Sequence, residues 1–333
     1  MLPSYTVVGG REYLGSTGLS AVLLNRGRRY ARRNLFHELR KAGFDTVVSI
    51  EPPPAQYDLE ELAARFPFVR FVLLQENLSL GEQINLAVSE LDTPLFFVMW
   101  NDLKLVTGGG ATRMAERLGH TADSGSRNVE KNAPTRLCTV PVIQSQRLEI
   151  LPTLIAPALQ RRKVHTRVLS TSQEGLRTLY PFDGVGIYDR ERFIRIGGFD
   201  GTLKSRYWQL MDFGFRAHLW GEEISVTQTL KLSYETTPPS EDNSTGADYH
   251  RFFLKNIAPV FRKDYAHLPL RRFLGFLFQT GKNLFDACEN FSEGRRWVHT
   301  NRFRWRCDPR TIVGFWNLDN EDGDPPQERE TSA

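Results

Sequence analysis

The sequence has few cysteines and no arrangement of them that could organise a fold. Cys138, Cys288 and Cys307 lie far apart, and none forms a CxxC pair or a Cys/His spacing suited to zinc. These absences exclude a disulfide framework and a structural zinc site as organising features. Cysteine use of this kind is typical of a reducing compartment, so we expect a cytoplasmic protein.

Long apolar runs are also absent. No stretch approaches the ~20 apolar residues that span a bilayer, and the N-terminus has no basic segment followed by a sustained apolar one. We therefore expect a protein that is neither secreted nor integral to a membrane. The 333 residues, of which 40% are hydrophobic and 11% aromatic, are enough to bury a large core.

Charge is distributed unevenly along the chain. The formal net charge is only +4, but between Arg251 and Arg310 there are 13 Lys and Arg residues against 5 Asp and Glu. Residues 319–330 reverse this pattern, with six acids and one Arg. We expect residues 319–333 to form an acidic, disordered tail.

Strand-like and helix-like patterns alternate over the first hundred residues. Ser79 and Glu82 stand in capping-box spacing at the start of one expected helix. The alternation predicts an α/β fold with a mostly parallel sheet between helices. The expected strands cover 19–25, 44–51, 68–77 and 95–100, and the expected helices cover 28–43, 58–66 and 79–91.

Polar side chains follow three of these strands. Asn25, Glu51 and Asp102 stand at strand ends, and ligands of parallel sheets bind beside the carboxyl ends of the strands. Residues 107–136 contain three consecutive glycines and few large apolar residues, so we expect a long loop there, serving as a lid or linker. The glycines are not followed by GK[ST], which argues against a phosphate-binding P-loop.

Several short motifs occur along the chain in a fixed order. They are LLN (23–25), VVSIE (47–51), ENLSLGEQIN (76–85), VMWND (98–102), IGGFD (196–200), and Asp212 followed by Arg216. In this order they resemble the family 2 type glycosyltransferases, which have the GT-A fold and use nucleotide-diphospho-sugar donors. The resemblance covers about residues 19–256 and implies a GT-A-like domain over residues 1–256.

The resemblance implies roles for particular side chains. Asp102 would hold a divalent cation, Mn²⁺ or Mg²⁺, that shares oxygen ligands with the donor diphosphate, and Glu235 lies near the position of a further ligand. Asp212 would be the general base of an inverting transfer, placed at the start of a helix. The donor would contact Asn25, Glu51, Asn85, Asn101 and Asp102, and the acceptor would contact Trp208 and Asp183.

Each charged residue also has a structural interpretation. Asp102 could cap a turn, Asp212 could stabilise a helix dipole, and Glu51 could be a solvated loop acid. Trp100 replaces the first acid of the family's Asp-x-Asp motif, which puts metal use in question. A group of arginines could attract an anionic donor or form a solvated helix face: Arg26, Arg28, Arg29, Arg32 and Arg33.

Residues 257–318 differ in character from what precedes them. LPLRRFLGFLFQTGKNLFDACENF is apolar with basic flanks, and RRWVHTNRFRWRC alternates Arg with aromatic residues. We expect a basic, aromatic-rich helical extension, which either packs on the GT-A-like domain or lies on the anionic inner face of a membrane beside a lipid-linked acceptor. The chain has no recognition motif for nucleic acid, and no nucleic-acid partner is expected.

The sequence therefore predicts a glycosyltransferase that moves a sugar from a nucleotide-diphospho-sugar to a glycan or lipid-linked acceptor. The alternative is a non-catalytic sugar-nucleotide-binding or scaffold protein on the same fold, which the missing motif acids at Trp100 and Met211 keep open.

Overall fold

The computed structural model describes residues 3–13, 15, 17–26, 32–54, 58–106, 109–123, 136–160, 163–170, 173–281 and 283–318. The expected acidic tail at residues 319–333 lies outside them, as do Arg28 and Arg29.

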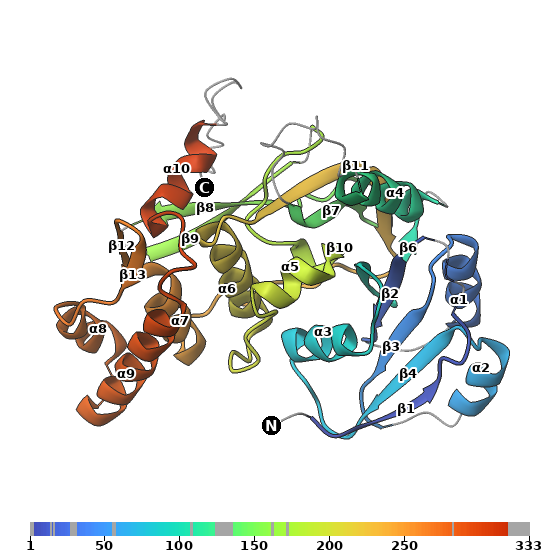
Figure 1. Cartoon of the computed structure of the whole chain (residues 1–333), viewed down its shortest axis with the longest axis horizontal. Helices are drawn as coiled ribbons and strands as arrows, with labels where there is room; N and C mark the ends of the chain where they lie inside the picture. Colours follow the sequence, from blue (N-terminus) through green and yellow to red (C-terminus); the bar gives the residue numbers. More distant parts are fainter. Residues whose placement is uncertain are drawn as a thin grey trace, which may run out of the picture.

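One large sheet forms the centre of the molecule (Figure 1). Within the described ranges it has nine strands. Their order across the sheet is β1 (Tyr5–Gly9), β4 (Val69–Leu74), β3 (Val47–Glu51), β2 (Leu19–Leu24), β5 (Leu95–Trp100), β10 (Gly186–Asp189), β7 (Arg136–Gln144), β11 (Glu223–Tyr234) and β6 (Leu103–Leu105). Every residue of β2, β3 and β5 is buried, as expected for strands covered on both faces.

Strand direction gathers several strand ends at one edge of this sheet. β2, β3, β4 and β5 run parallel to one another, which confirms the predicted parallel core. β10 runs antiparallel to both β5 and β7, and β11 runs parallel to β7. Because two reversals restore the original direction, the carboxyl end of β11 lies at the same edge as those of β2, β3 and β5. The residues just before β10 lie at this edge too.

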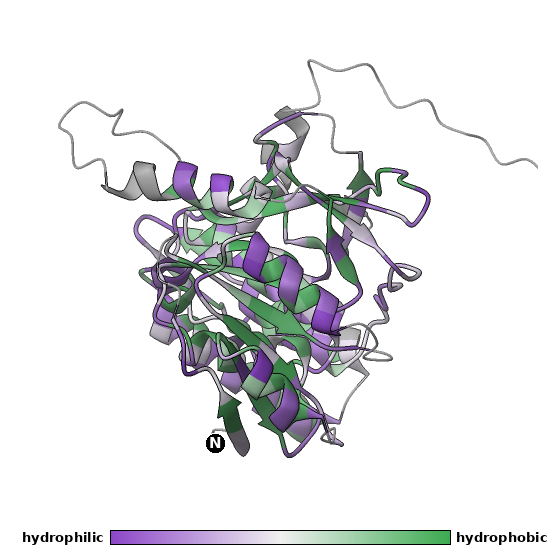
Figure 2. Cartoon of the chain, turned by 90° about the vertical axis from the view of Figure 1, so that its right-hand side faces the viewer, coloured by the Kyte–Doolittle hydropathy of each residue, from purple (hydrophilic) through white to green (hydrophobic). Residues whose placement is uncertain are grey.

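Helices flank the sheet, and the predicted α/β fold class is confirmed. Figure 2 shows the mainly hydrophobic strands surrounded by helices that carry hydrophilic residues on their outer surfaces. α3 begins at the predicted capping box, in which Ser79 and Glu82 bond reciprocally. The helices in this part of the chain are α1 (Arg32–Lys41), α2 (Leu59–Arg65), α3 (Leu80–Ser89), α4 (Gly110–Asp123), α5 (Arg190–Arg195) and α6 (Arg206–Leu219).

The expected long loop at residues 107–136 is partly wrong, because α4 occupies its first half. Ala111, Met114 and Ala115 are buried, and the helix packs against β11. Together with the partly buried Leu118, these residues recur at helical spacing, so an apolar pattern was present in the sequence. The three consecutive glycines at the start of the helix favoured a loop in the sequence prediction.

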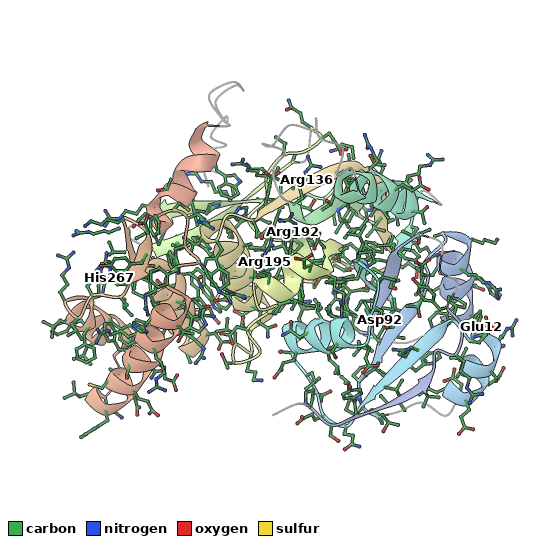
Figure 3. The ribbon with its side chains drawn as sticks, in the orientation of Figure 1. Glu12, Asp92, Arg136, Arg192, Arg195 and His267 are labelled. Atoms are coloured by element: carbon green, nitrogen blue, oxygen red, sulfur yellow. The ribbon has the colours of Figure 1, made fainter. Side chains whose placement is uncertain are left out.

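α5 is fixed to the turn that precedes β11 by a pair of arginines. Arg192 Nη1 and Arg195 Nη2 donate to Glu222 at 3.1 and 2.6 Å (Figure 3). Figure 3 shows both arginines on α5, near the middle of the molecule.

The C-terminal part of the chain is helical, as predicted, and packs on the sheet domain. Its apolar side chains, including Phe291, Trp305, Ile312 and Trp316, belong to the same buried cluster as the sheet. This packing was one of the two interpretations of the extension.

The elements of the C-terminal part are α7 (Ala247–Phe252), a π-helix η2 (Phe253–Ile257), a hairpin of β12 (Val260–Arg262) and β13 (Tyr265–His267), α8 (Arg272–Thr280), α9 (Leu284–Asn301) and α10 (Pro309–Leu318). A further hairpin, β8 (Leu154–Gln160) and β9 (Lys163–Leu169), contacts α10. The division of the chain at residue 256 stays a prediction.

Candidate active site

Arg26 is the centre of a charged cluster at the shared edge of the sheet. It follows β2, and its Nε and Nη2 donate to the two oxygens of Asp102 at 2.9 and 3.0 Å. Its Nη1 donates to Asp183 Oδ2 at 2.6 Å. The guanidinium also lies over the Trp100 ring, 4.3 Å from its centroid. Arg26 therefore joins the residues that end β5 to the turn that precedes β10.

Asp183 is held in a strained turn by three side-chain donors. Its φ is +54°, in the left-handed region, and its side chain is buried. Besides Arg26, Arg206 Nη1 donates to Oδ1 at 3.0 Å and the Tyr234 hydroxyl donates to Oδ2 at 2.9 Å. Burial raises the pKa of Asp183, and the two arginines act in the opposite direction. Asp183, expected only as an acceptor contact, is thus a central member of the cluster.

Asp102 and Glu235 do not face a common point. The Asp102 carboxylate accepts from Arg26 and from the Thr236 hydroxyl, at 2.8 Å, whereas the Glu235 carboxylate pairs with Lys104. The expected cation site between Asp102 and Glu235 is therefore not formed. Within the described ranges, no group of three or more His, Cys, Asp or Glu side chains is arranged to hold a metal ion.

A second polar cluster lies beside the first, where β2 and β3 end. Asn25 Nδ2 donates to the Ile50 carbonyl at 2.7 Å and to the Glu51 carboxylate at 3.2 Å. Glu51 is 1% exposed and pairs with Arg32, so its interpretation as a solvated loop acid is wrong. The buried Oδ1 of Asn25 and the buried Nε and Nη1 of Arg32 have no hydrogen-bond partner among the described residues. Buried polar atoms without a partner are uncommon, and they mark this cluster as a place where a polar ligand would fit.

Asn101 lies beside the first cluster, whereas Asn85 belongs to neither cluster. Asn101 Oδ1 accepts from the Arg26 backbone N–H at 3.0 Å. Asn85 donates to the Phe199 carbonyl at 2.8 Å and accepts from the Phe199 N–H at 2.9 Å. Both polar groups of Asn85 are used to fix the IGGFD turn, so its expected contact with the donor is not supported.

Trp208 does not present its ring to an acceptor. It is buried, packs against Tyr249 and Phe252, and donates from Nε1 to the Ser244 carbonyl at 2.8 Å. The predicted acceptor contact is therefore wrong in this structure. The indole instead anchors the loop that connects β11 to α7.

The predicted position of Asp212 at the start of a helix is also wrong. α6 begins at Arg206, so Asp212 lies in the middle of the helix rather than at its start, and its side chain is fully buried. Oδ2 accepts from Arg216 Nη2 at 2.9 Å, and Oδ1 lies 2.7 Å from Lys255 Nζ and accepts from Asn256 Nδ2 at 2.8 Å. The side chain is enclosed and both oxygens have internal partners, so Asp212 offers no accessible oxygen to an acceptor in this structure.

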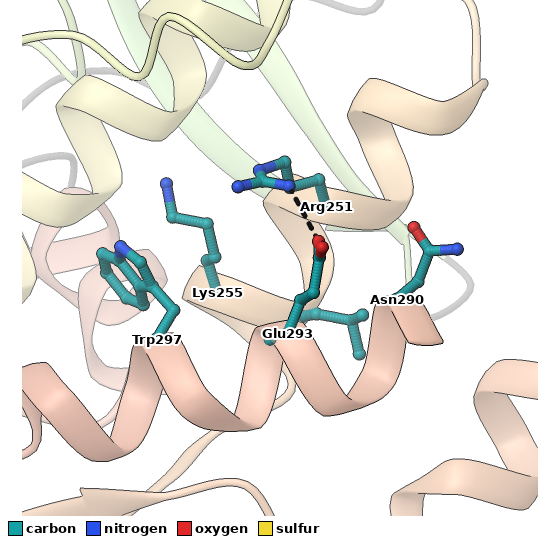
Figure 4. Close-up of a pocket in the computed structure, with 7 residues that line it drawn as sticks. Arg251, Lys255, Asn290, Glu293 and Trp297 are labelled. Carbon is teal, nitrogen blue, oxygen red and sulfur yellow. Dashed lines mark hydrogen bonds and ion pairs between the residues drawn. The ribbon is translucent and has the colours of Figure 1, made fainter. Parts of the chain in front are cut away.

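Lys255 connects Asp212 to the C-terminal part of the chain. Its Nζ lies 2.7 Å from Asp200 Oδ2 and 4.5 Å from the centroid of the Trp297 ring (Figure 4). Although burial raises the pKa of Asp212, Lys255 and Arg216 together hold it below its usual value. Asp212 is thus a buried, ion-paired structural residue that is ionised at neutral pH.

Glu241 is a carboxylate of the shared edge that the sequence analysis missed. The Tyr180 hydroxyl donates to Oε2 at 2.9 Å, and the buried Oε1 has no partner among the described residues. Burial raises the pKa of Glu241, the Tyr180 hydrogen bond and Arg206 lower it, and Asp183 adds to the rise. Arg206 and Tyr234 were missed as well. No motif singles these residues out, because only the return of β11 to this edge brings them together.

Comparisons with known proteins identify the fold. No family model matches the sequence, and no curated protein matches it. GalNAc-T7, solved with UDP, GalNAc and Mn²⁺, superposes with a TM-score of 0.51 at 13% identity, over 71% of this chain and 48% of that one. S. aureus TarS 1-349, in complex with UDP-GlcNAc, superposes with a TM-score of 0.50 at 12% identity, over 83% of this chain and 71% of that one. The chain thus spans about half the length of GalNAc-T7, and its fold is the GT-A fold of nucleotide-sugar glycosyltransferases, as predicted.

The role of Asp212 can be tested by replacing it with Asn. Asp212→Asn leaves Arg216 and Lys255 buried with one negative charge fewer, so we expect a loss of about 3–5 kcal/mol in the free energy of unfolding. Chemical denaturation measures this loss. As a control, Glu293→Gln removes an exposed acid that pairs with Arg251, and it should change stability by less than roughly 0.5 kcal/mol.

The stability of the wild type and that of Asp212→Asn should depend differently on pH in acid. A carboxylate whose pKa is lowered in the folded state contributes stability above its unfolded pKa, near ~4, and loses it as the pH falls through the folded value. Asp212 and Asp200 both have lowered pKa values. The stability difference between wild type and Asp212→Asn should therefore be constant near neutral pH and shrink below about pH 4. A difference that stays unchanged at low pH would contradict the assignment.

Proposed function

We propose that the protein is a glycosyltransferase that uses a nucleotide-diphospho-sugar donor. The observation that carries the proposal is the meeting of two clusters at one edge of a GT-A sheet. One has buried donor and acceptor atoms, on Asn25 and Arg32, that have no partner within the described part of the chain. The other has two arginines, Arg26 and Arg206, held by carboxylates. The first suits the hydrogen-bonding groups of a nucleoside, and the second suits a diphosphate.

For the transfer to proceed, the site must stabilise the charge that develops on the leaving diphosphate. When the bond between sugar and diphosphate breaks, negative charge builds up on the diphosphate. Arginines that are already fixed in place stabilise that charge without having to reorganise. Arg26 and Arg206 are fixed in this way by Asp102 and Asp183.

An inverting transfer also needs a base that takes the proton of the acceptor hydroxyl. We propose Glu241 for this role in place of Asp212. Its buried Oε1 has no partner among the described residues, and its raised pKa brings it closer to neutral pH, where a general base is most effective. Arg206 lowers that pKa and Asp183 raises it, which supports a position for Glu241 near the charged cluster.

The acceptor is proposed to be a glycan or lipid-linked molecule at an anionic membrane surface. Leu270, Leu274 and Phe278 are exposed and spaced four residues apart at α8, and Phe285 is 86% exposed at the start of α9. These residues lie in the segment with 13 basic residues against 5 acidic ones. A surface of exposed apolar side chains and positive charge suits the interface of an anionic bilayer. No helix within the described ranges is long and apolar enough to cross a bilayer.

The competing proposal is a non-catalytic protein that binds sugar nucleotides on the same fold. Trp100 and Met211, where the family has acids, are the observations that favour it. Turnover of a donor distinguishes the two proposals, whereas nucleotide binding is common to both.

Nucleotide binding is expected to depend on Asn25 and not on Asn85. We expect at least one of UDP, GDP, CDP, ADP and TDP to raise the melting temperature of the protein. Asn25→Ala should weaken the binding of that nucleotide about tenfold, since the substitution removes polar contacts from a buried site. Asn85→Ala should lower stability and leave the dissociation constant of the folded protein unchanged. Calorimetric titration measures both constants, and equal losses in the two variants would count against the proposed nucleoside position.

Glu241→Gln is expected to separate binding from turnover. The amide keeps the shape and the contact with Tyr180 but cannot take up a proton, so turnover should fall ~10²–10⁴-fold while nucleotide affinity is kept. The assay is release of nucleoside diphosphate from a panel of nucleotide sugars in the presence of acceptor. Glu174→Gln, at a carboxylate bonded to Thr227, is the control. Normal turnover by Glu241→Gln would exclude it as the base.

Membrane binding is expected to depend on the exposed aromatic residues of α8 and α9. Wild type should sediment with vesicles that contain anionic lipid and much less with neutral ones. Phe278→Ser with Phe285→Ser should abolish most of that binding, because both side chains would lie in the bilayer interface. Ile194→Ser, at an exposed apolar residue of α5, is the matched control. Equal sedimentation with neutral and anionic vesicles would contradict the proposal.

A further inference from the structure

The charged cluster contains a fixed cation at the point where a divalent metal ion was expected. The guanidinium of Arg26 lies between the Asp102 and Asp183 carboxylates and bonds to both. We propose that Arg26 replaces the divalent metal ion at this site and binds the donor diphosphate directly, so that donor binding needs no metal. This inference rests on the proposed function.

The carboxylates do not fit a metal ion, because all four of their oxygens already accept hydrogen bonds. Asp102 Oδ1 accepts from Arg26, and Oδ2 accepts from Arg26 and Thr236. Asp183 Oδ1 accepts from Arg206, and Oδ2 accepts from Arg26 and Tyr234. A cation bound by oxygen ligands at 2.0–2.6 Å would have to displace the Arg26 guanidinium from both aspartates.

Trp100 explains why the arginine is held at this place. It stands where the family's motif has its first acid, and its ring lies 4.3 Å beneath the guanidinium of Arg26. Its Nε1 also donates to the Asp183 carbonyl at 3.0 Å. An aromatic ring stabilises a cation stacked on it, whereas it offers no ligand to a metal ion. The change from acid to Trp therefore favours Arg26 over a metal ion at the same point.

The charges of the cluster balance without a metal ion. Arg26 and Arg206 bring two positive charges, and Asp102 and Asp183 bring two negative ones. The cluster is therefore neutral with Arg26 in place, and a divalent ion added to it would be repelled by the two arginines.

Arg26 retains the means to bind a phosphate. A guanidinium has five N–H groups, of which the contacts with Asp102 and Asp183 use three. Its side chain is 21% exposed, so part of it faces solvent. The fork of an arginine suits phosphate oxygens, and the two aspartates and Trp100 fix its orientation before the donor arrives.

The experiment is a calorimetric titration of UDP and GDP into the full-length protein, once with excess EDTA and once with excess Mn²⁺. We expect the dissociation constant of the nucleotide that binds to agree within about twofold between the two conditions. In EDTA, Arg26→Ala should raise the dissociation constant at least tenfold. Arg26→Lys keeps the charge but loses the guanidinium fork, so its dissociation constant should lie between those of wild type and Arg26→Ala. Arg192→Ala, at a similarly exposed arginine paired with Glu222, should have no effect.

A titration with Mn²⁺ alone gives a second readout. Wild type should not bind Mn²⁺ at this site, whereas Arg26→Ala, which leaves the two aspartates without their shared cation, should gain Mn²⁺ affinity. Unchanged circular dichroism and a measurable melting transition show that the variant is folded.

The outcomes separate this inference from the proposed function. Binding by wild type that disappears in EDTA and returns with Mn²⁺ overturns the role of Arg26 and leaves a nucleotide-binding protein. The role of Arg26 is also overturned if Arg26→Ala binds the nucleotide as tightly as wild type. If neither nucleotide binds in either condition, while the wider nucleotide panel is also negative, the proposed function fails and this inference fails with it.

Discussion

The direction of the strands is the constraint on which the candidate site depends. β10 enters the sheet antiparallel between β5 and β7, and this double reversal returns β11 to the direction of the parallel strands. Without it, Tyr234 would leave the sheet at the opposite edge from Asp102. With it, residues that are more than two hundred positions apart, Arg26 and Tyr234, contact the same carboxylate. The site is therefore a property of topology first and of side-chain chemistry second.

Two networks of buried charge hold the molecule, and they differ in what remains accessible. In one, Arg26 and Arg206 balance Asp102 and Asp183, and the Arg26 side chain is partly exposed, so that a ligand can reach it. In the other, Lys255 and Asp212 are fully enclosed and every contact is internal. Both consist of aspartates paired with long basic side chains. Their difference in solvent exposure is the reason why the first network is proposed as a ligand site and the second is not.

Much of the fold could be predicted from local pattern. The runs that became β2, β3, β4 and β5 are apolar enough to be recognised individually, and the capping box at Ser79 marks the start of α3. β1 was missed because its residues alternate weakly and its position depends on pairing with β4, which lies some sixty residues further along. α4 was missed because the three glycines at its start indicated a loop, although Ala111, Met114 and Ala115 behind them stand at helical spacing.

The candidate site was harder to predict, since motifs name residues and do not say where a side chain points. Asp102 and Asp183 were both selected, but their shared partner Arg26 was grouped with arginines that could attract an anionic donor or form a solvated helix face, and its contact with the two aspartates was not foreseen. Asp212 and Trp208 were selected because they follow the IGGFD turn, and both turned out to face the interior. The motif order was sufficient for the fold, whereas the orientation of each side chain depends on packing that no short motif contains.

The lysine bridge has a consequence for how the protein could work at a surface. α9 packs on the π-helix that carries Lys255, Lys255 is bonded to α6 through Asp212, and α6 begins with Arg206, which touches Asp183. A continuous series of packed and ion-paired contacts thus joins α9 to the charged cluster. If α8 and α9 rest on a bilayer, these contacts would hold the proposed active site at a set height above the lipid headgroups. The length of the acceptor's stem, and not only the chemistry of its terminal sugar, would then decide which molecules can be extended.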